Sequence, residues 1–302
     1  MSDVTAADEV YAVIEESARL VGAPCSPEKI RPILTAFEDA LPEAGMVFSV
    51  ATGQRPPGEL DYTISIPPAF GDPYAVAVSH GLVTPADHPV ATLLADIQAQ
   101  VSISEHLIDA EVSSGFSKIY AHFPHDKLTL PRLADIPSMP PAVAQNAELF
   151  ARHHLTDVAM IGIDYRRKTV NLYFAQLPDA FRTAHNILSL NRAIGLPDPS
   201  GPMLEFAQRS FRAYVTLGWD SPKIERISYA PLPVRDPSAL AVPIEPDIEK
   251  FLLNTRRTYD GPPFVIAAAK WTAEGEHLNL GPYCRLSPLM RTLLRQLTGE
   301  QV

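Results

Sequence analysis

The chain has 302 residues, of which 46% are hydrophobic and 20% are charged, a composition typical of a globular protein with a sizeable core. A formal net charge of -10 argues against a general nucleic-acid-binding protein, because phosphate contacts need a basic surface. No apolar run approaches the roughly 18 residues of a membrane span, and the acidic start MSDVTAADEV does not resemble a signal peptide. With only two cysteines in no metal or redox spacing, we expect a cytoplasmic protein.

Helical and strand-like patterns alternate along the chain in a regular order. The first helix is expected over 5–21, where Val10, Ile14 and Ala18 share one face, and Ser26-Pro27 opens a second. Further helices are expected near 88–101, 141–154, 178–194, 202–209, 245–258 and 287–298. Strand pairs are expected at 45–53 with 58–67, 105–112 with 115–123, 156–165 with 168–175, 210–218 with 223–231, and 263–272 with 276–285.

These strand pairs recur with a nearly fixed period. The second strands start near residues 58, 115, 168, 223 and 276, which points to a repeat architecture. The connections ATGQRPPGE, SSG, RRK, WDSPK and AEGE mark hairpins, so the strands should be antiparallel. We therefore predict an α+β fold: a ten-stranded antiparallel β-barrel built from five ααββ repeats, with a ring of helices outside, as a single domain over 1–302.

Aligning the five second strands places polar residues at equivalent positions. The fourth residues are Asp61, Lys118, Asn171, Arg226 and Asn279. Two residues later, on the same face, stand Thr63, Tyr120, Tyr173, Ser228 and Gly281. This alternation also fits an open sheet with one solvated face, but in a closed barrel the polar face surrounds a cavity. A cavity holding Lys118, Arg226 and Arg167 would bind an anion, because unpaired buried cations are unfavourable.

Several other chemistries have no support in the sequence. There is no Walker loop, no GxGxxG after a strand, no GxSxG elbow and no HExxH helix. His153 and His154 are adjacent on an expected helix and face different directions, which argues against a shared metal. Anion binding and aromatic side chains remain as the chemical resources of the site.

The runs GELDYTISIP, VSSGFSKIYAHFP, DIPSMPPAVAQNAELFARHHL, IDYRRKTVNLYF, RSFRAYVTLGW, KIERI and LNLGPY carry a family resemblance. Together they resemble the bacterial aromatic prenyltransferases of the ααββ-barrel (ABBA) type, in order from about residue 4 to 298. The resemblance implies transfer of a dimethylallyl or geranyl group, with dimethylallyl favoured, from a prenyl diphosphate to a phenol, naphthalene, quinone or phenazine in secondary metabolism. The reaction would be an electrophilic aromatic substitution.

The resemblance also implies roles for individual residues. Diphosphate-binding positions of the family correspond to Lys118, Arg167, Asn171, Tyr214 and Arg226, of which Lys118, Tyr214 and Arg226 would carry catalysis. The prenyl and acceptor pocket would be formed by Ser49, Tyr120, Tyr173, Phe211, Ala230, Gly281, Tyr283 and Met290. Two positions depart from the naphterpin-type members: Asn279 replaces a diphosphate-binding lysine and Met290 replaces a glutamine. The alternation of inward and outward side chains along its strand suggests that Lys270 faces inward and supplies the missing charge.

Asp61 has two interpretations. It matches a magnesium-binding aspartate of the family and could share an ion with Asp109, or it could be the salt-bridge partner of Lys118. Since the family includes metal-independent members, we expect that no cofactor is required. We expect a monomer that binds neither nucleic acid nor membrane. The alternatives to prenyl transfer are a non-catalytic carrier of a small apolar anion and a diphosphate hydrolase.

Overall fold

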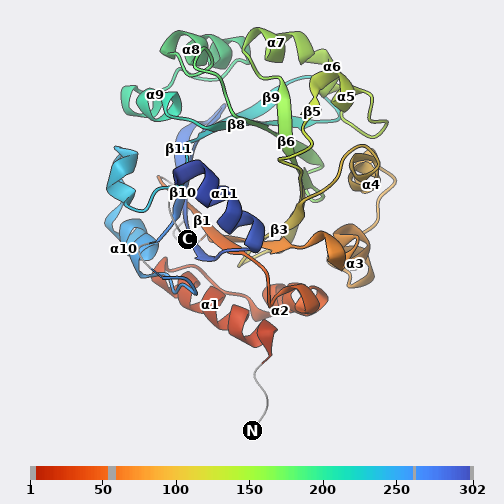
Figure 1. The fold of residues 1–302 in the computed structure, drawn as a ribbon, viewed down its shortest axis with the longest axis vertical. Coiled ribbons are helices and arrows are strands. Elements are labelled where there is room, and N and C mark those ends of the chain that lie inside the picture. Colours follow the sequence, from red (N-terminus) through yellow and green to blue (C-terminus); the bar gives the residue numbers. More distant parts are fainter. Residues whose placement is uncertain (1–4, 54–58, 261–262, 300–302) are drawn as a thin grey trace.

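Ten antiparallel strands close into a barrel at the centre of the fold (Figure 1). The computed structural model describes residues 5–53, 59–260 and 263–299. Neighbouring strands follow the order β4-β3-β2-β1-β11-β10-β9-β8-β7-β6, and pairing of β4 with β6 closes the circle. Its strands are β1 (Met46–Ala51), β2 (Asp61–Ile66), β3 (Glu105–Glu111), β4 (Gly115–His122), β6 (Asp157–Asp164), β7 (Thr169–Ala175), β8 (Arg212–Gly218), β9 (Ile224–Ala230), β10 (Val265–Thr272) and β11 (Gly275–Arg285). The predicted closed antiparallel barrel is confirmed.

All five predicted strand pairs are present, with small differences at their ends. The two-residue strand β5 (Leu128–Thr129), which pairs with β6, was not predicted. Strand β2 begins at Asp61 rather than at residue 58, and residues 54–58 of the predicted ATGQRPPGE turn lie outside the described residues. Closure leaves no exposed edge on the ten main strands, because each has a partner on both sides.

Helices surround the barrel, as Figure 1 shows in the view along its axis. Their bounds are α1 (Ala6–Leu20), α2 (Pro27–Ala36), α3 (Pro73–Ser79), α4 (Leu93–Gln98), α5 (Leu130–Ala134), α6 (Ala142–Gln145), α7 (Ala147–Arg152), α8 (Ala184–Ala193), α9 (Gly201–Gln208), α10 (Pro246–Asn254) and α11 (Pro288–Thr298). Within the described residues, none of these helices combines the length and hydropathy needed to cross a bilayer.

The single helix predicted over 141–154 is wrong, because the chain forms α6 and α7 with a break at Asn146. There the side-chain Nδ2 of Asn146 donates to the carbonyl of Ala142 at 2.8 Å and to that of Pro222 at 2.7 Å. Asparagine competes in this way with regular helical hydrogen bonding. The helix predicted from 178 starts only at Ala184, where the Thr183 hydroxyl caps it by accepting from the amide of Asn186.

The helices cover the apolar face of the strands. Positions opposite the polar ring, at Ile64, Ile119, Leu172, Ile227 and Leu280, are at most 1% exposed. Full burial of such a side chain stabilises the fold by roughly 1.5–3 kcal/mol, so the orientation of each strand is firmly set. The polar face must therefore point into the barrel, as the alternation predicted.

The last helix, α11, has a different position from the others. Figure 1 shows it lying across the barrel opening rather than in the outer ring. The Ser287 hydroxyl caps its start by accepting from the amide of Met290 at 3.2 Å. Leu294 is 1% exposed and forms a small apolar cluster with Phe264 and Leu286. One end of the barrel is closed by this helix.

Candidate active site

The barrel encloses a cavity of about 320 Å³, a size typical of small-molecule sites. Most of the residues predicted for the site line it: Ser49, Asp61, Lys118, Tyr120, Arg167, Asn171, Tyr173, Phe211, Tyr214, Arg226, Ala230, Lys270, Asn279, Tyr283 and Met290. Alternation along the strands brings them together, since every second side chain of a barrel strand faces the interior. The structure thus places these residues in one cavity, while the role of each stays a prediction.

Gly281 was predicted to line the pocket, and this prediction is wrong. It is not among the described residues that line the cavity. A Cβ atom at this position would lie 1.6 Å from the carbonyl oxygen of Phe48 on the neighbouring strand β1. The glycine therefore serves the close approach of two backbones, which no other residue would allow.

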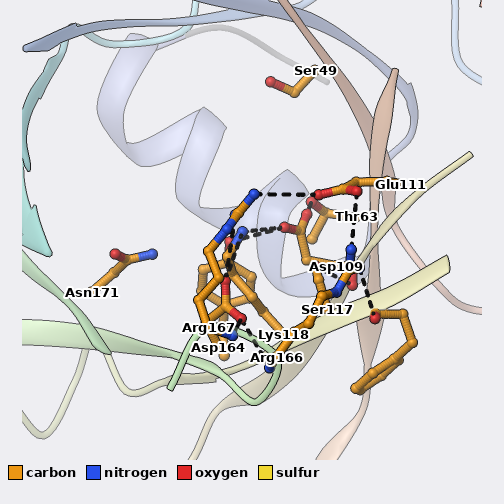
Figure 2. A network of polar contacts seen from close by, with 12 residues as sticks. Ser49, Thr63, Asp109, Glu111, Ser117, Lys118, Asp164, Arg166, Arg167 and Asn171 are labelled. Carbon is orange, nitrogen blue, oxygen red and sulfur yellow. Dashed lines mark hydrogen bonds and ion pairs between the residues drawn. The ribbon is translucent and has the colours of Figure 1, made fainter. Parts of the chain in front are cut away.

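Lys118 is held by carboxylates at one end of the cavity. Its Nζ donates to Oδ2 of Asp109 at 3.0 Å and lies 4.0 Å from Oδ2 of Asp164 (Figure 2). The hydroxyl of Thr63 donates to the other oxygen of Asp109 at 2.7 Å. Burial by itself would lower the pKa of Lys118, but Asp109 and Asp164 outweigh it and raise that pKa above its ordinary value. The lysine remains a cation inside the barrel.

The turn between β6 and β7 presents one of two adjacent arginines to the cavity. Oδ1 of Asp164 accepts from the backbone amides of Arg166 at 3.1 Å and Arg167 at 2.7 Å, which fixes the turn. Arg166 then points away and donates to the backbone carbonyl of Phe116 at 3.1 Å. Arg167 lines the cavity with a 62% exposed side chain, 3.7 Å from Oδ2 of Asp164 (Figure 2). Arg167 is thus a long, exposed cation at the rim of the cavity.

Asn171 and Arg226 lie side by side in the wall. Oδ1 of Asn171 accepts from the hydroxyl of Thr216 at 2.7 Å and from Nη2 of Arg226 at 3.4 Å. Arg226 Nε is buried without a hydrogen-bond partner among the described residues. None of the carboxylates that the structure describes forms an ion pair with Arg226. Arg226 thus lines the cavity as a cation without a carboxylate partner among the described residues, an arrangement that suits an anionic ligand.

The inward orientation predicted for Lys270 is what the structure shows. Lys270 lines the cavity on β10, opposite Ser228 of β9 and His277 of β11. Asn279, which stands where a family lysine was expected, donates from Nδ2 to the hydroxyl of Ser49 at 3.0 Å. A lysine therefore lies one strand away from position 279, and its role in place of the missing charge stays a prediction. We call the region of Lys118, Asn171, Arg226, Lys270 and Asn279 the charged end of the cavity.

Asp61 also lies at the charged end, but it is not the partner that the sequence suggested. The ion pair of Lys118 is formed with Asp109, so the salt-bridge interpretation of Asp61 is wrong. Burial and the nearby Asp109 raise the pKa of Asp61 to about 7, against the opposing effect of Lys270 and Lys118. A carboxyl with this pKa is about half protonated at neutral pH.

The residues present do not form a good magnesium site. Both oxygens of Asp109 are engaged, one by Thr63 and one by Lys118. Asp61 is the ligand that the family resemblance implied, and its raised pKa weakens it as a ligand near neutrality because metal ligation needs the ionised form. Among the described residues, no three His, Cys, Asp or Glu side chains cluster in a way that could hold a metal ion.

Tyrosines form the middle of the cavity wall. The rings of Tyr173 and Tyr214 are stacked, with centroids 4.4 Å apart, and Tyr120 meets Tyr173 edge-on at 6.0 Å. Gly162 leaves room for this arrangement, since a Cβ there would lie 2.6 Å from the ring of Tyr120. Burial raises the pKa of all three phenols, so they stay neutral. Neutral aromatic faces attract a cation without reacting with it.

The opposite end of the cavity contains polar residues that sequence reasoning missed. His122 and Glu105 form a buried pair in which Nδ1 of His122 lies 3.4 Å from Oε1 of Glu105. The hydroxyl of Ser287, which also caps α11, donates to Oε2 of Glu105 at 3.1 Å. Arg212 lines the cavity here, with its Cζ 5.9 Å from the centroid of the Tyr173 ring. We call the region of Glu105, His122, Arg212, Tyr283 and Met290 the α11 end.

Strand parity was a signal that could have found two of these residues. His122 follows Lys118 and Tyr120 on the inward face of β4, and Arg212 precedes Tyr214 on that of β8. Ser287 offered no such signal, because its contact with Glu105 joins segments 182 residues apart.

Comparison with known proteins identifies the family. The family model described as aromatic prenyltransferase Orf2 matches residues 5–283. This chain belongs to the aromatic prenyltransferase Orf2 family. It is 45% identical to a flaviolin linalyltransferase of Streptomyces virginiae, with 88% of each chain covered. It is 39% identical to a 5,10-dihydrophenazine-1-carboxylate 9-dimethylallyltransferase of Streptomyces anulatus, over 99% of this chain and all of the relative.

Solved structures of prenyltransferases share the fold of this aromatic prenyltransferase. The 5-dimethylallyltryptophan synthase of Streptomyces coelicolor superimposes with a TM-score of 0.56 at 12% identity, covering 93% of this chain and 97% of the other. At that identity the likeness concerns the fold alone. Family membership itself confirms the enzyme class expected from the sequence, which is aromatic prenyl transfer.

Proposed function

We propose that the charged end binds the diphosphate of a dimethylallyl or geranyl donor, and that the aromatic acceptor lies toward the α11 end. The observation that carries this proposal is that Arg226, which has no ion-pair partner among the described residues, shares one barrel cavity with stacked tyrosines. The donor needs both features, because its ionisation produces an anion and an allylic cation at neighbouring points.

The residues divide the chemistry between them. Lys118, Arg167, Arg226 and Lys270 stabilise the negative charge that develops as the bond between the allylic carbon and the diphosphate oxygen breaks. The faces of Tyr120, Tyr173 and Tyr214 stabilise the prenyl cation and exclude the water that would trap it as an alcohol. The arene then attacks the cation and forms the new carbon–carbon bond. Its ring proton passes to a basic oxygen of the released diphosphate, which restores aromaticity.

The relatives suggest the range of substrates to test. One is named for a linalyl group, a ten-carbon unit, and another for a dimethylallyl group, a five-carbon unit. Their named acceptors are a hydroxylated naphthoquinone and a dihydrophenazine carboxylate. We retain dimethylallyl diphosphate as the preferred donor, with geranyl diphosphate as its competitor, and an electron-rich bicyclic or tricyclic arene as acceptor.

The test is a product assay. The protein is incubated with an equal mixture of dimethylallyl and geranyl diphosphate and with flaviolin, a dihydroxynaphthalene or a dihydrophenazine. We expect a product heavier by one prenyl unit, formed only when donor and acceptor are both present. Binding of donor and acceptor without product across the panel would favour the carrier alternative. Pyrophosphate release that does not depend on an acceptor would favour the hydrolase.

A further inference from the structure

Arg212 is a cation in the cavity wall for which the described residues provide no counter-ion. Among the described residues, no carboxylate lies within ion-pair distance of its guanidinium, and its Nε is buried without a hydrogen-bond acceptor. Burial lowers the pKa of Arg212, and the groups that oppose this effect are the phenols of Tyr173, Tyr283 and Tyr214. An arginine nevertheless keeps its charge under such conditions, so the described protein groups do not offset the energetic penalty of its burial.

The position of Arg212 separates it from the diphosphate site. On the paired strands β8 and β9, Arg212 is opposite Ala230, whereas Arg226 is opposite Thr216 at the other end of the same ladder. Tyr214 lies between the two arginines on the inward face of β8. A diphosphate held by Arg226 and Lys118 is thus separated from Arg212 by the layer of tyrosines.

A second polar group faces the cavity at the same end. His122 lines the cavity, and its Nε2 is buried without a partner among the described residues, while Nδ1 faces Glu105. Burial lowers the pKa of His122, with Arg212 contributing, so the ring is neutral at physiological pH. With the proton on Nδ1, shared with Glu105, Nε2 is a hydrogen-bond acceptor.

We propose that Arg212 binds an acidic oxygen of the aromatic acceptor, either a carboxylate or an ionised phenol, and that His122 accepts a hydrogen bond from a neighbouring hydroxyl or N–H group. This inference rests on the proposed function, because it names the acceptor class of that same site. It makes the enzyme selective for anionic acceptors. The planar arginine fork suits such an oxygen, and the contact orients the ring against the tyrosine layer where the prenyl cation forms.

The experiment measures acceptor binding separately from turnover. Three probes are used: a dihydroxynaphthoic acid, its methyl ester, and the acid with both hydroxyls methylated. Each is titrated into the protein saturated with the thio analogue of dimethylallyl diphosphate, which resists ionisation. We expect the wild type to bind the free acid between about 10- and 100-fold more tightly than the probe that lacks the recognised oxygen. Whichever of the two derivatives binds with lower affinity shows whether this oxygen belongs to the carboxylate or to a phenol.

Arg212→Gln should remove this discrimination, and Arg212→Lys should keep part of it because the charge remains without the fork. Arg209→Gln, at an exposed arginine outside the cavity, is the matched control and should keep the wild-type preference. Equal or undetectable binding of the three probes by the wild type would overturn the proposal. So would an Arg212→Gln variant that loses affinity for the donor analogue but keeps the acid preference. Absence of any prenylated product would instead count against the proposed function, since these affinities do not depend on turnover.

Discussion

The 3.0 Å ion pair between Lys118 Nζ and Asp109 Oδ2 means that one of the cations proposed to bind the donor already has a carboxylate partner within the protein. Arg226 differs, because its polar contact is with the amide oxygen of Asn171 rather than with a carboxylate. Lys118 and Arg226 therefore have the same proposed role in donor binding but different roles in the structure. Lys118 also neutralises buried carboxylates, whereas Arg226 is available to the ligand.

This difference predicts that Lys118→Ala and Arg226→Ala will look alike in activity but not in stability. Each should lower kcat/KM by at least about 100-fold, because each removes a preorganised charge from the leaving group. Lys118→Ala should also destabilise the fold by roughly 3 kcal/mol, since the buried Asp109 loses its ion-pair partner. Arg226→Ala should change stability by less than about 1 kcal/mol. Thermal unfolding and steady-state kinetics of both variants check this, and a double variant that retained most activity would refute the diphosphate site.

The adjacent arginines of the β6–β7 turn offer a matched pair. Arg167→Ala should raise the KM for the donor by roughly tenfold, because it removes a rim cation that faces the cavity. Arg166→Ala should leave that KM unchanged, because Arg166 does not line the cavity and its guanidinium is bound to the carbonyl of Phe116 and the carboxylate of Glu111. Equal effects of the two substitutions would show that the turn responds as a unit and that neither arginine is singled out for the donor.

Asp61 should make donor affinity depend on pH around neutrality. Its pKa of about 7 means that the carboxyl is neutral below this value and becomes a carboxylate above it. We expect the KM for the donor to rise as the pH increases from 6 to 8, because the new negative charge repels the diphosphate and competes for Lys118 and Lys270. Asp61→Asn should flatten this part of the profile. The comparison at each pH removes the contribution from titration of the donor itself.

Metal removal should leave the reaction largely intact. The carboxylate oxygens of Asp109 are occupied by Thr63 and Lys118, and the cations at the charged end can stabilise the leaving group directly. We therefore expect at least half of the initial rate in excess EDTA, with no increase on adding Mg²⁺. A loss of more than about tenfold that Mg²⁺ restores would return Asp61 to the role of metal ligand.

His106 should destabilise the protein in mild acid. Burial lowers its pKa to about 4 from 6.5, and its Nε2 lies 3.1 Å from Nε2 of Gln98, which donates to it. Between these two pH values the unfolded chain takes up a proton at His106 that the folded chain does not, so acid favours unfolding. The free energy of unfolding is therefore not reduced by His106 above pH 6.5, and it decreases as the pH falls below that value. In that interval the free energy of unfolding of the wild type, measured relative to that of His106→Gln, should decrease by up to about 1.4 kcal/mol for each pH unit of acidification. A difference that stayed constant from pH 7 to pH 4.5 would contradict the assignment.

Much of the fold was predictable because periodicity and burial act on every strand. Alternation on β4 placed Lys118 and Tyr120 inward and Ile119 outward, and the structure agrees at each position. Single side chains that compete with the backbone were harder to foresee. The amide of Asn146 divides a predicted helix, and nothing in the local pattern indicates that it will bind the carbonyl of Pro222.

The site was predictable where it depends on parity and family resemblance, and less so where it depends on contacts between distant segments. Asp109 rather than Asp61 pairs with Lys118 because the register of β3 against β4 sets them opposite each other. Gly281 has the parity of an inward residue, yet the spacing of β1 and β11 decides its role. The α11 end is assembled from β3, β4, β8 and a C-terminal helix, a combination that no sequence window contains.

The position of α11 has a consequence for how such an enzyme could change its substrate. The family match covers residues 5–283, and α11 begins at Pro288, so the helix that closes the α11 end of the cavity lies beyond the matched residues. Met290, Leu293, Leu294 and Leu297 enter the cavity from this helix alone. These four cavity-lining residues thus lie in one terminal helix, so they can be changed without altering a barrel strand. Grafting this helix from a relative offers a route to new acceptors that leaves the ionising machinery in the barrel untouched.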